Sequence, residues 1–237
     1  SSIDPNKTIG WLIEEPLKIH GIGKTKQERA EKVSQVLKAV GLDESYRTRW
    51  PNELSGGQRQ RVAIAIALIL DPDFVVCDEP VSALDVSVQA QVLNLLLDLR
   101  EQFGLTYLFI SHDLNVVSYM SDRIGVMYLG SLVELGSGEA ISQMPLHPYT
   151  QALFSASMDV EGDRERIILS GDLPSPAHPP AGCPFHTRCF ACTDRCKQEK
   201  PRLREFEGGR FCACHLVEQR TGLQPVEESK ALEAKSQ

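Results

Sequence analysis

The sequence predicts an α/β domain built on a parallel sheet, followed by a separate cysteine-rich extension. Two apolar runs, residues 74–77 and 106–111, are too short for helices and are typical of strands buried on both faces. A helical pattern over residues 86–99 lies between them, and the order strand, helix, strand implies parallel strands. Composition indicates the extension, because six of the seven cysteines fall between Cys183 and Cys214.

Length and composition are those of an ordinary folded protein. The 237 residues can bury a sizeable core, and the apolar fraction of 42% is close to the globular average. The net charge of −7 argues against a general electrostatic grip on nucleic acid or anionic lipid. The sequence has neither an apolar run of ~20 residues nor the blocks of a signal peptide. We therefore expect a cytosolic chain that docks onto membrane proteins, with reduced or metal-bound cysteines.

Two helices are expected before the first strand. Residues 25–40 place apolar side chains at helical spacing, Thr25 and Glu28 predict a capping box, and Gly41 ends the helix. The second helix begins after Ser55, a good N-cap residue, and is closed by the Asp-Pro pair that follows it.

The pattern changes after the second strand. The stretch RIGVMYLGSLVELG predicts a hairpin that turns at Gly130 and Ser131. Prolines then cluster from Pro174 to Pro184, which marks the start of a different composition. The predicted divisions are a domain over residues 1–158, a cysteine-rich module over 159–222 and a flexible tail over 223–237.

The helix that follows Ser55 opens with two glycines, which predicts a close approach to its backbone. The N–H groups of a first helical turn, reinforced by the helix dipole, form an anion site. Gly56 and Gly57 have no side chain and would let a phosphate reach those groups. A plain serine-capped helix with glycines in a tight entry turn is the more common cause of such a sequence, so the surrounding residues must decide.

Acidic and imidazole side chains follow the two predicted strands. Asp78 and Glu79 come at the carboxyl end of the first strand, where ligands bind in open α/β sheets. Asp78 suits Mg²⁺ held through its water shell, and Glu79 suits the polarisation of an attacking water. His112 follows the second strand and is placed to reach a terminal phosphate. The plainer alternatives are acidic residues that end a strand in solvent and a structural histidine.

The order and spacing of these pieces resemble the ATP-binding-cassette (ABC) ATPases, which have a P-loop NTPase fold. In chain order, LSGGQRQR matches the signature motif of that family, FVVCDEP the Walker B strand, SALD the D-loop and SHD the switch histidine. The stretch HPYTQALFSA and the cysteine-rich stretch that starts GCPFHTRC further resemble the ATPase subunits of bacterial oligopeptide and dipeptide importers. The resemblance implies a helical signature subdomain over about residues 1–70 and a Walker B to switch-histidine core over about 71–135, that is, the second half of the parallel sheet.

The resemblance also implies roles for the signature residues. In this family two ATPase subunits stack head to tail, and each ATP lies between the P-loop of one subunit and the signature of the other. Gly56 and Gly57 would then face a γ-phosphate bound by the partner, with Ser55 donating a hydrogen bond. The implied nucleotide-binding residues are Ser55, Gly56, Gly57, Gln58 and Asp85, of which Asp85 would carry communication across the dimer.

The remaining implied roles concern an ATP held by the same chain. Glu79 would be the general base, His112 the γ-phosphate sensor, and Asp78 would lie near the Mg²⁺. These roles require a P-loop, G-x-x-x-x-G-K-[ST]. The stretch KIHGIGKT ends in the right residues, but Lys18 stands where the first glycine is required, and Thr25 is better explained as a helix cap.

By the same resemblance, the stretch NKTIGWLIEEPLKIHG matches the segment just after the Q-loop of the family. The P-loop, the nucleotide-stacking aromatic and the Q-loop glutamine would then precede Ser1. We therefore expect an N-terminally truncated chain that alone neither binds ATP tightly nor hydrolyses it.

The cysteines of the extension predict a metal site. Clustered thiolates in a reducing compartment favour Zn²⁺ or an iron–sulfur cluster, each with four sulfur ligands. The resemblance to peptide-importer ATPases selects Cys183, Cys189, Cys196 and Cys214, which in some members are associated with a [4Fe–4S] cluster. Unligated cysteines in a loop-rich module are the alternative. Two further cysteines leave the choice of ligands open: Cys192 and Cys212.

Three functions follow from these observations. The first is an ATPase that uses ATP and Mg²⁺ to energise oligopeptide or dipeptide import at the cytoplasmic face of the bacterial membrane. Its partners would be a second ABC ATPase subunit, two transmembrane permease subunits and, indirectly, an extracytoplasmic peptide-binding protein. The second is a metal or iron–sulfur module with a vestigial ATPase half. The presence of both Glu79 and His112 argues against it, because a decayed ATPase would not need to keep both. The third is a non-transport ABC ATPase acting on DNA, which predicts a coiled-coil insertion or basic surface that this sequence lacks, so no nucleic-acid partner is expected.

Overall fold

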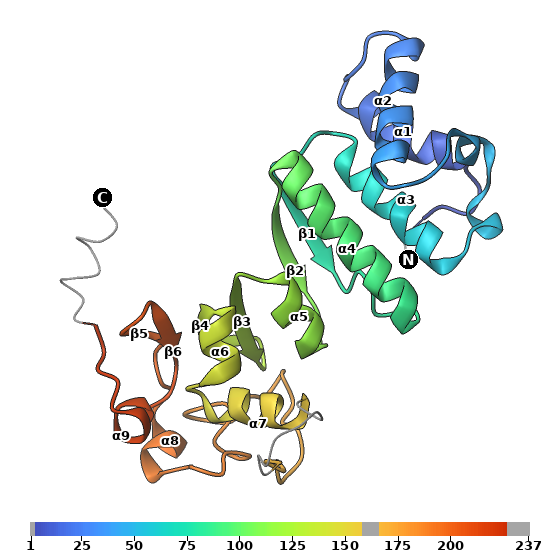
Figure 1. Cartoon of the computed structure of the whole chain (residues 1–237). Helices are drawn as coiled ribbons and strands as arrows, with labels where there is room; N and C mark the ends of the chain where they lie inside the picture. The colour runs from blue at the N-terminus through green and yellow to red at the C-terminus, as the bar shows by residue number, and fades with distance from the viewer. Residues whose placement is uncertain (1–2, 158–165, 227–237) are drawn as a thin grey trace. The chain divides into compact units, whose positions relative to one another are not determined.

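The computed structural model describes residues 3–157 and 166–226, and the chain divides into two compact units, Ser1–His112 and Asp113–Gln237. Figure 1 shows the helices and strands of each unit along the chain. None of the helices in the described ranges combines the length and apolar character needed to cross a bilayer.

The first unit begins with a group of helices that pack on one another. They are α1 (Ile9–Ile19), α2 (Lys26–Ala39) and α3 (Gly56–Leu68), with the short 3-10 helices η1 (Glu44–Thr48) and η2 (Pro51–Glu53) before α3. The predicted capping box of α2 is confirmed, because Thr25 Oγ1 accepts the N–H of Glu28 at 3.1 Å while the Glu28 carboxylate accepts the N–H of Thr25. Gly41, with a φ of 70°, follows the end of α2 as predicted.

Helix α1 was not predicted, because Pro16 and two neighbouring glutamates hide its pattern. Its buried side chains nevertheless recur at helical spacing and form one apolar face. Pro16 lies inside the helix and removes one backbone hydrogen bond, which the burial of this face offsets. The buried residues of α1 are Ile9, Leu12, Ile13 and Leu17.

The second half of the first unit is a two-stranded sheet with one crossover helix. β1 (Phe74–Asp78) and β2 (Thr106–Ile110) pair in parallel, and α4 (Val86–Phe103) connects them, which confirms the predicted strand, helix, strand unit. Tyr107 reaches α4 from one face of the sheet, since its Oη donates to the carbonyl of Leu96 at 2.9 Å.

Burial of the sheet on both faces was predicted and is wrong for the described residues. Side chains alternate across a strand, so each strand sends every second residue to the same face. On the face away from Tyr107 the apolar side chains are about half exposed, and the sheet has only one covered face. These side chains are Phe74 at 55%, Val76 at 54%, Leu108 at 49% and Ile110 at 43% exposure.

The second unit is built on an antiparallel sheet in the order β3-β4-β6-β5. The predicted hairpin is confirmed: β3 (Arg123–Tyr128) and β4 (Ser131–Ser137) pair, and Gly130 takes a φ of 73° at the turn. The remaining elements are α5 (Leu114–Met120), α6 (Gly138–Gln143), α7 (Pro148–Ser157), α8 (Asp194–Gln198), β5 (Arg204–Phe206), β6 (Arg210–Cys212) and α9 (Val217–Thr221).

The cysteine-rich segment shares this sheet with the hairpin. β6 pairs with β4, with Glu134 opposite Cys212, and Phe185 packs on Tyr128 with ring centroids 5.2 Å apart. The compact units consequently divide at His112, whereas the predicted boundary lies after residue 158, within the segment outside the described residues.

The segment predicted as a flexible tail begins inside the folded unit. Pro225 forms a bridge with Phe206, and the N–H of Val226 donates to the carbonyl of Glu205 at 2.9 Å. Residues 227–237 of the predicted tail lie outside the described residues.

Candidate functional site

Glu79 and His112 meet at the carboxyl edge of the β1–β2 sheet, as the strand order predicts. Glu79 Oε1 and His112 Nδ1 are 2.9 Å apart, and the N–H of Glu79 donates to the carbonyl of Ile110 at 3.0 Å. In the described part of the chain, the other carboxylate oxygen, Oε2, is buried without a hydrogen-bond partner. A buried carboxylate oxygen is unfavourable until it receives a donor, so this site favours one more polar group, such as a water.

The backbone of Glu79 is strained. Its φ is 49°, a left-handed conformation that residues other than glycine rarely adopt. Such strain persists where surrounding contacts hold it, and it concentrates at functional sites. Ser82 supplies one of these contacts, since its Oγ donates to the carbonyl of Glu79 at 3.1 Å. Sequence reasoning did not single out this serine as a positioning residue.

Ser55 caps α3 as predicted. Its Oγ accepts the N–H of Gln58 at 3.3 Å, and Gln58 Oε1 accepts the N–H of Ser55 at 3.0 Å. The side-chain amide of Gln58 also donates to Tyr46 Oη at 2.8 Å. Gln58 therefore fixes the turn at the start of α3 through bonds within the chain, and Tyr46 is a supporting residue that the sequence did not reveal.

The two glycines of this turn pack against the end of the loop that precedes α4 and against the first turn of α4. A Cβ on Gly57 would lie 2.5 Å from Cγ1 of Val88, a separation that side chains do not tolerate, and one on Gly56 would lie 3.2 Å from Cδ2 of Leu84. Packing is thus a second reason for glycine at position 57, beside the predicted contact with a phosphate.

Asp85 caps α4 at the end of the loop that follows Glu79. Its Oδ1 accepts the hydroxyl of Ser87 at 2.8 Å and the N–H of Val88 at 3.0 Å, and these bonds, with that from Ser87 the stronger, lower the pKa of Asp85. Gln89 holds the same loop, because its Nε2 donates to the carbonyls of Val81 and Leu84 at 3.0 and 3.1 Å. Asp78 lies exposed at the end of β1, open to a hydrated cation.

In the segment that resembles a P-loop, the backbone N–H groups bind a side chain of the same segment. The N–H groups of Lys24 and Thr25 both donate to Glu28 Oε2, at 2.7 and 3.4 Å. Lys18 lies within α1 and pairs with Glu14 at 2.9 Å. The backbone donors that a P-loop offers to phosphate are here satisfied by a carboxylate, which agrees with the interpretation of Thr25 as a helix cap.

The four cysteines that the resemblance selects line one small cavity of about 10 Å³ in the second unit. The N–H of Cys183 donates to the carbonyl of Cys196 at 2.8 Å, which joins the two ends of the segment at residues 183–196. Burial raises the pKa of Cys183 and of Cys189 to about 11, so both are neutral thiols near pH 7. Cys192 and Cys212 do not line the cavity.

The predicted metal centre is not preformed. Within residues 3–157 and 166–226, no three His, Cys, Asp or Glu side chains are placed to hold one ion. The donor set nevertheless fits a thiolate-loving metal, because four cysteines line one void. That void has about the volume of one water, so a single ion needs less rearrangement than a four-iron cluster.

Glu134 is a buried carboxylate that organises the second unit. It accepts the N–H groups of Leu146 and His147 at 2.7 and 2.9 Å, and Arg210 Nη2 lies 3.4 Å away. Desolvation raises the pKa of Glu134, although these bonds oppose the shift. His147 is itself buried, which lowers the pKa of its imidazole to about 4. A single acidic residue within an apolar hairpin strand was the sequence signal that could have identified this network.

Comparisons with known proteins identify both halves of the chain. The ABC transporter family model matches residues 2–82, and the model for the oligopeptide/dipeptide transporter C-terminal region matches residues 133–196. Oligopeptide transport ATP-binding protein AppF of Bacillus subtilis is 53% identical over 221 residues, which cover 91% of this chain and 67% of the relative. Dipeptide transport ATP-binding protein DppF of Haemophilus influenzae is 50% identical over 220 residues, covering 92% of this chain and 67% of the relative.

Solved structures support the same fold. The dimeric structure of MJ0796, a bacterial ABC transporter cassette, matches with a TM-score of 0.51 and 34% identity, over 57% of this chain and 59% of that one. An inward-facing structure of a putative metal-chelate type ABC transporter gives a TM-score of 0.56 at 24% identity, over 65% of this chain and 60% of that one, and so speaks for the fold alone. The predicted ABC ATPase type of fold is confirmed.

Proposed function

Because the chain belongs to the family of ATP-binding proteins of oligopeptide and dipeptide ABC transporters, we propose that it is an ATP-hydrolysing subunit that energises peptide import. The observation that carries this proposal is the contact between Glu79 and His112 at the carboxyl edge of the sheet. The proposed partners are a second ATPase subunit and two permease subunits, with an extracytoplasmic peptide-binding protein acting through them. The proposed location is the cytoplasmic face of the membrane.

In the proposed reaction, which requires a P-loop to hold the ATP, Glu79 acts as the general base on a water that attacks the γ-phosphate. His112 engages Oε1 of the carboxylate, which leaves the buried oxygen Oε2 to accept a proton from that water. When ATP is bound, the imidazole of His112 is proposed to contact the γ-phosphate. Asp78 would hold Mg²⁺ through its water shell, and the bound ion would supply charge neutralisation at the phosphates. Most of the rate enhancement would come from positioning.

The turn at Ser55 is proposed to complete the nucleotide site of a partner subunit. The capping box fixes Ser55 and the first turn of α3, so the positive end of the helix dipole has a defined direction. Ser55 Oγ and the backbone of Gly56 and Gly57 would contact the γ-phosphate of an ATP held by the partner. Gln58 and Asp85 serve this site by fixing the turn and the neighbouring loop.

The second proposed component is a metal centre, zinc or [4Fe–4S], held by Cys183, Cys189, Cys196 and Cys214. The four side chains line one cavity, and they would be deprotonated when the metal binds. Such a centre would supply structural stability to the second unit by linking its separate segments.

The ATPase proposal is tested with Glu79→Gln in the assembled transporter, by measuring ATP hydrolysis in membrane vesicles. Loss of a general base typically costs about 10²–10⁴-fold in rate, so we expect at least a hundredfold decrease. Glu101→Gln, on an exposed position of α4, is the matched control and should hydrolyse ATP at the original rate. Equal rates for Glu79→Gln and the control would contradict the assignment and favour a vestigial ATPase half.

A further inference from the structure

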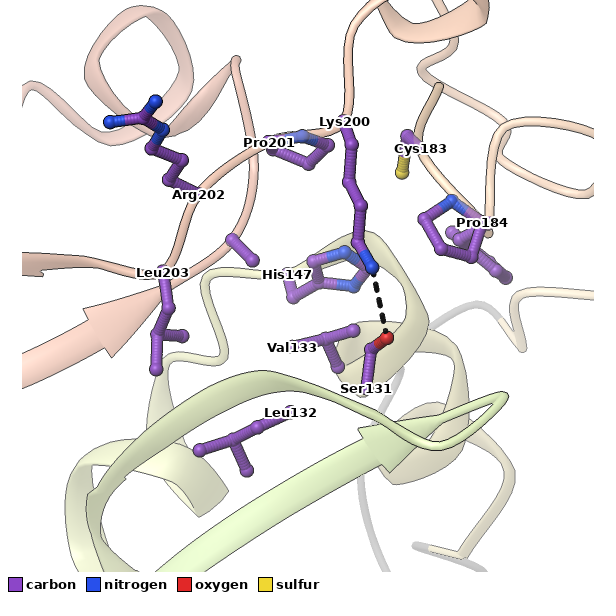
Figure 2. A pocket seen from close by; sticks show the side chains of 12 residues that line it. Ser131, Leu132, Val133, His147, Cys183, Pro184, Lys200, Pro201, Arg202 and Leu203 are labelled. Atoms are coloured by element: carbon purple, nitrogen blue, oxygen red, sulfur yellow. Dashed lines mark hydrogen bonds between the residues drawn. The ribbon is translucent and has the colours of Figure 1, made fainter. Parts of the chain in front are cut away.

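A second and larger cavity lies in the second unit and takes part in none of the roles above. It has a volume of about 560 Å³ and opens between the start of β4, the segment at residues 183–185 and the segment at residues 200–203 that precedes β5 (Figure 2). Cavities of this size are typical of sites for small organic molecules. The wall formed by His147, Cys183 and Phe185 also borders the four-cysteine cavity.

Lys200 is the cation that the cavity offers to a ligand. Lys200 points into the cavity and its Nζ donates to Ser131 Oγ at 3.4 Å, as Figure 2 shows. Among the described residues, the one contact found for the Lys200 ammonium is this bond to Ser131, and the residues that line the cavity include neither aspartate nor glutamate. A lysine ammonium held only by a long bond to a hydroxyl is available to an incoming anion.

His147 also lines the cavity. Its Nδ1 accepts the N–H of Tyr149 at 3.1 Å, which assigns the ring proton to Nε2. The imidazole is therefore a further neutral donor. Arg202 differs from Lys200, because its guanidinium points away from both the histidine and the lysine.

Apolar side chains form the rest of the lining. They leave room for a hydrophobic body next to the single inward-pointing cation, which matches a monoanion better than a phosphate dianion. The apolar residues that line the cavity are Leu132, Val133, Pro184, Phe185, Pro201, Leu203 and Ala213.

We propose that this cavity binds a small amphipathic carboxylate, with the carboxylate group at Lys200 and Ser131 and the apolar part against Leu132 and Leu203. This site lies outside the nucleotide-binding residues, and the proposal does not depend on the chain being an ATPase. It assigns to the second unit a ligand site of its own, one wall of which is shared with the cysteine cavity.

The test uses calorimetric titration of the full chain with N-acetyl-L-phenylalanine and with its uncharged amide. We expect saturable binding of the carboxylate, and binding of the amide that is at least about tenfold weaker, because a charged hydrogen bond is lost. Lys200→Met should also lower the affinity for the carboxylate by about tenfold. Arg202→Met removes the same charge from an outward-pointing side chain and should leave the affinity within about twofold.

Three outcomes would overturn the proposal: no saturable binding of the carboxylate, equal binding of the amide, or equal losses in the two charge variants. Both substituted side chains are exposed, so thermal denaturation should show the same folded state for each. Ser131→Ala provides a second measure if Lys200→Met does not fold. It should weaken carboxylate binding by at least about threefold, and an unchanged affinity would count against the site.

Discussion

Substitution of Gly57 by alanine separates the two reasons for glycine at this position. The new methyl group would lie 2.5 Å from Cγ1 of Val88, which the Asp85 cap holds in the first turn of α4. Overpacking of this kind costs about 1–3 kcal/mol, and the higher helix propensity of alanine returns up to about 1 kcal/mol. We therefore expect Gly57→Ala to lower the free energy of unfolding by about 1–2 kcal/mol, which corresponds to roughly 2–8 °C in Tm.

The double variant G57A/V88A shows whether packing is the whole explanation. Removal of the two Val88 methyl groups opens the space that the new methyl group needs, so the double variant should recover about 1 kcal/mol relative to the sum of the single changes. A phosphate that approaches the backbone at Gly57 would still meet the new side chain. ATP hydrolysis by the assembled transporter should consequently remain at least about tenfold below the original rate.

The assays are urea denaturation followed by circular dichroism, and ATP hydrolysis in membrane vesicles. Recovery of both stability and hydrolysis in the double variant would refute the phosphate contact at Gly57 and leave packing as the only cause. Gly56→Ala is the graded control. Its methyl group would lie 3.2 Å from the flexible end of Leu84, so we expect a smaller loss of stability than for Gly57→Ala.

Three further predictions concern other parts of the chain. The depressed pKa of His147, about 4 against an ordinary 6.5, means that the unfolded chain binds the extra proton between these values. Stability should thus fall as the pH decreases from 6.5 to 4, and His147→Gln should flatten this part of a pH series of urea titrations. Cys196→Ser should abolish the metal binding measured by elemental analysis, whereas Cys192→Ser should preserve it. A visible absorption band that is lost with dithionite would identify an iron–sulfur cluster, and a colourless protein that contains zinc would exclude one. Gln89→Leu should release the loop after Glu79, lower ATP hydrolysis and leave Tm within a few degrees, as measured by the vesicle assay and calorimetry.

Features with a local cause were predictable from the sequence. The capping box at Thr25, the N-cap at Ser55, the hairpin turn at Gly130 and the meeting of Glu79 with His112 each follow from a few neighbouring residues or from the strand order. Helix α1 was missed because Pro16 argues against a helix, and the apolar face that stabilises the helix becomes apparent only from its burial in the structure.

Apart from the contact of Glu79 with His112, contacts between distant residues were not predictable: the single acidic residue in the hairpin strand could have marked Glu134, but not its partner. Glu134 and Arg210 are 76 residues apart in the sequence, and their contact exists only because β6 pairs with β4. The half-exposed sheet face has a similar cause, since an apolar run shows that a strand can be buried on both sides but does not show what covers it. The steric need for glycine at position 57 is also non-local, because it arises from Val88 on another helix.

The packing of the glycine turn on α4 offers a physical connection between the turn proposed to serve the partner's ATP and the Glu79 loop proposed to serve this chain's own ATP. The turn at Gly57 touches the residues that begin α4, and Gln89 ties that helix to the carbonyls of the loop after Glu79. Ser82 then holds the strained backbone of Glu79 through its carbonyl. A ligand that shifts the turn at Gly57 would therefore also shift the loop that sets the position of Glu79, the proposed base. If this connection operates, Gln89→Leu should weaken the effect of Gly57→Ala on ATP hydrolysis, so that the two losses combine to less than their product.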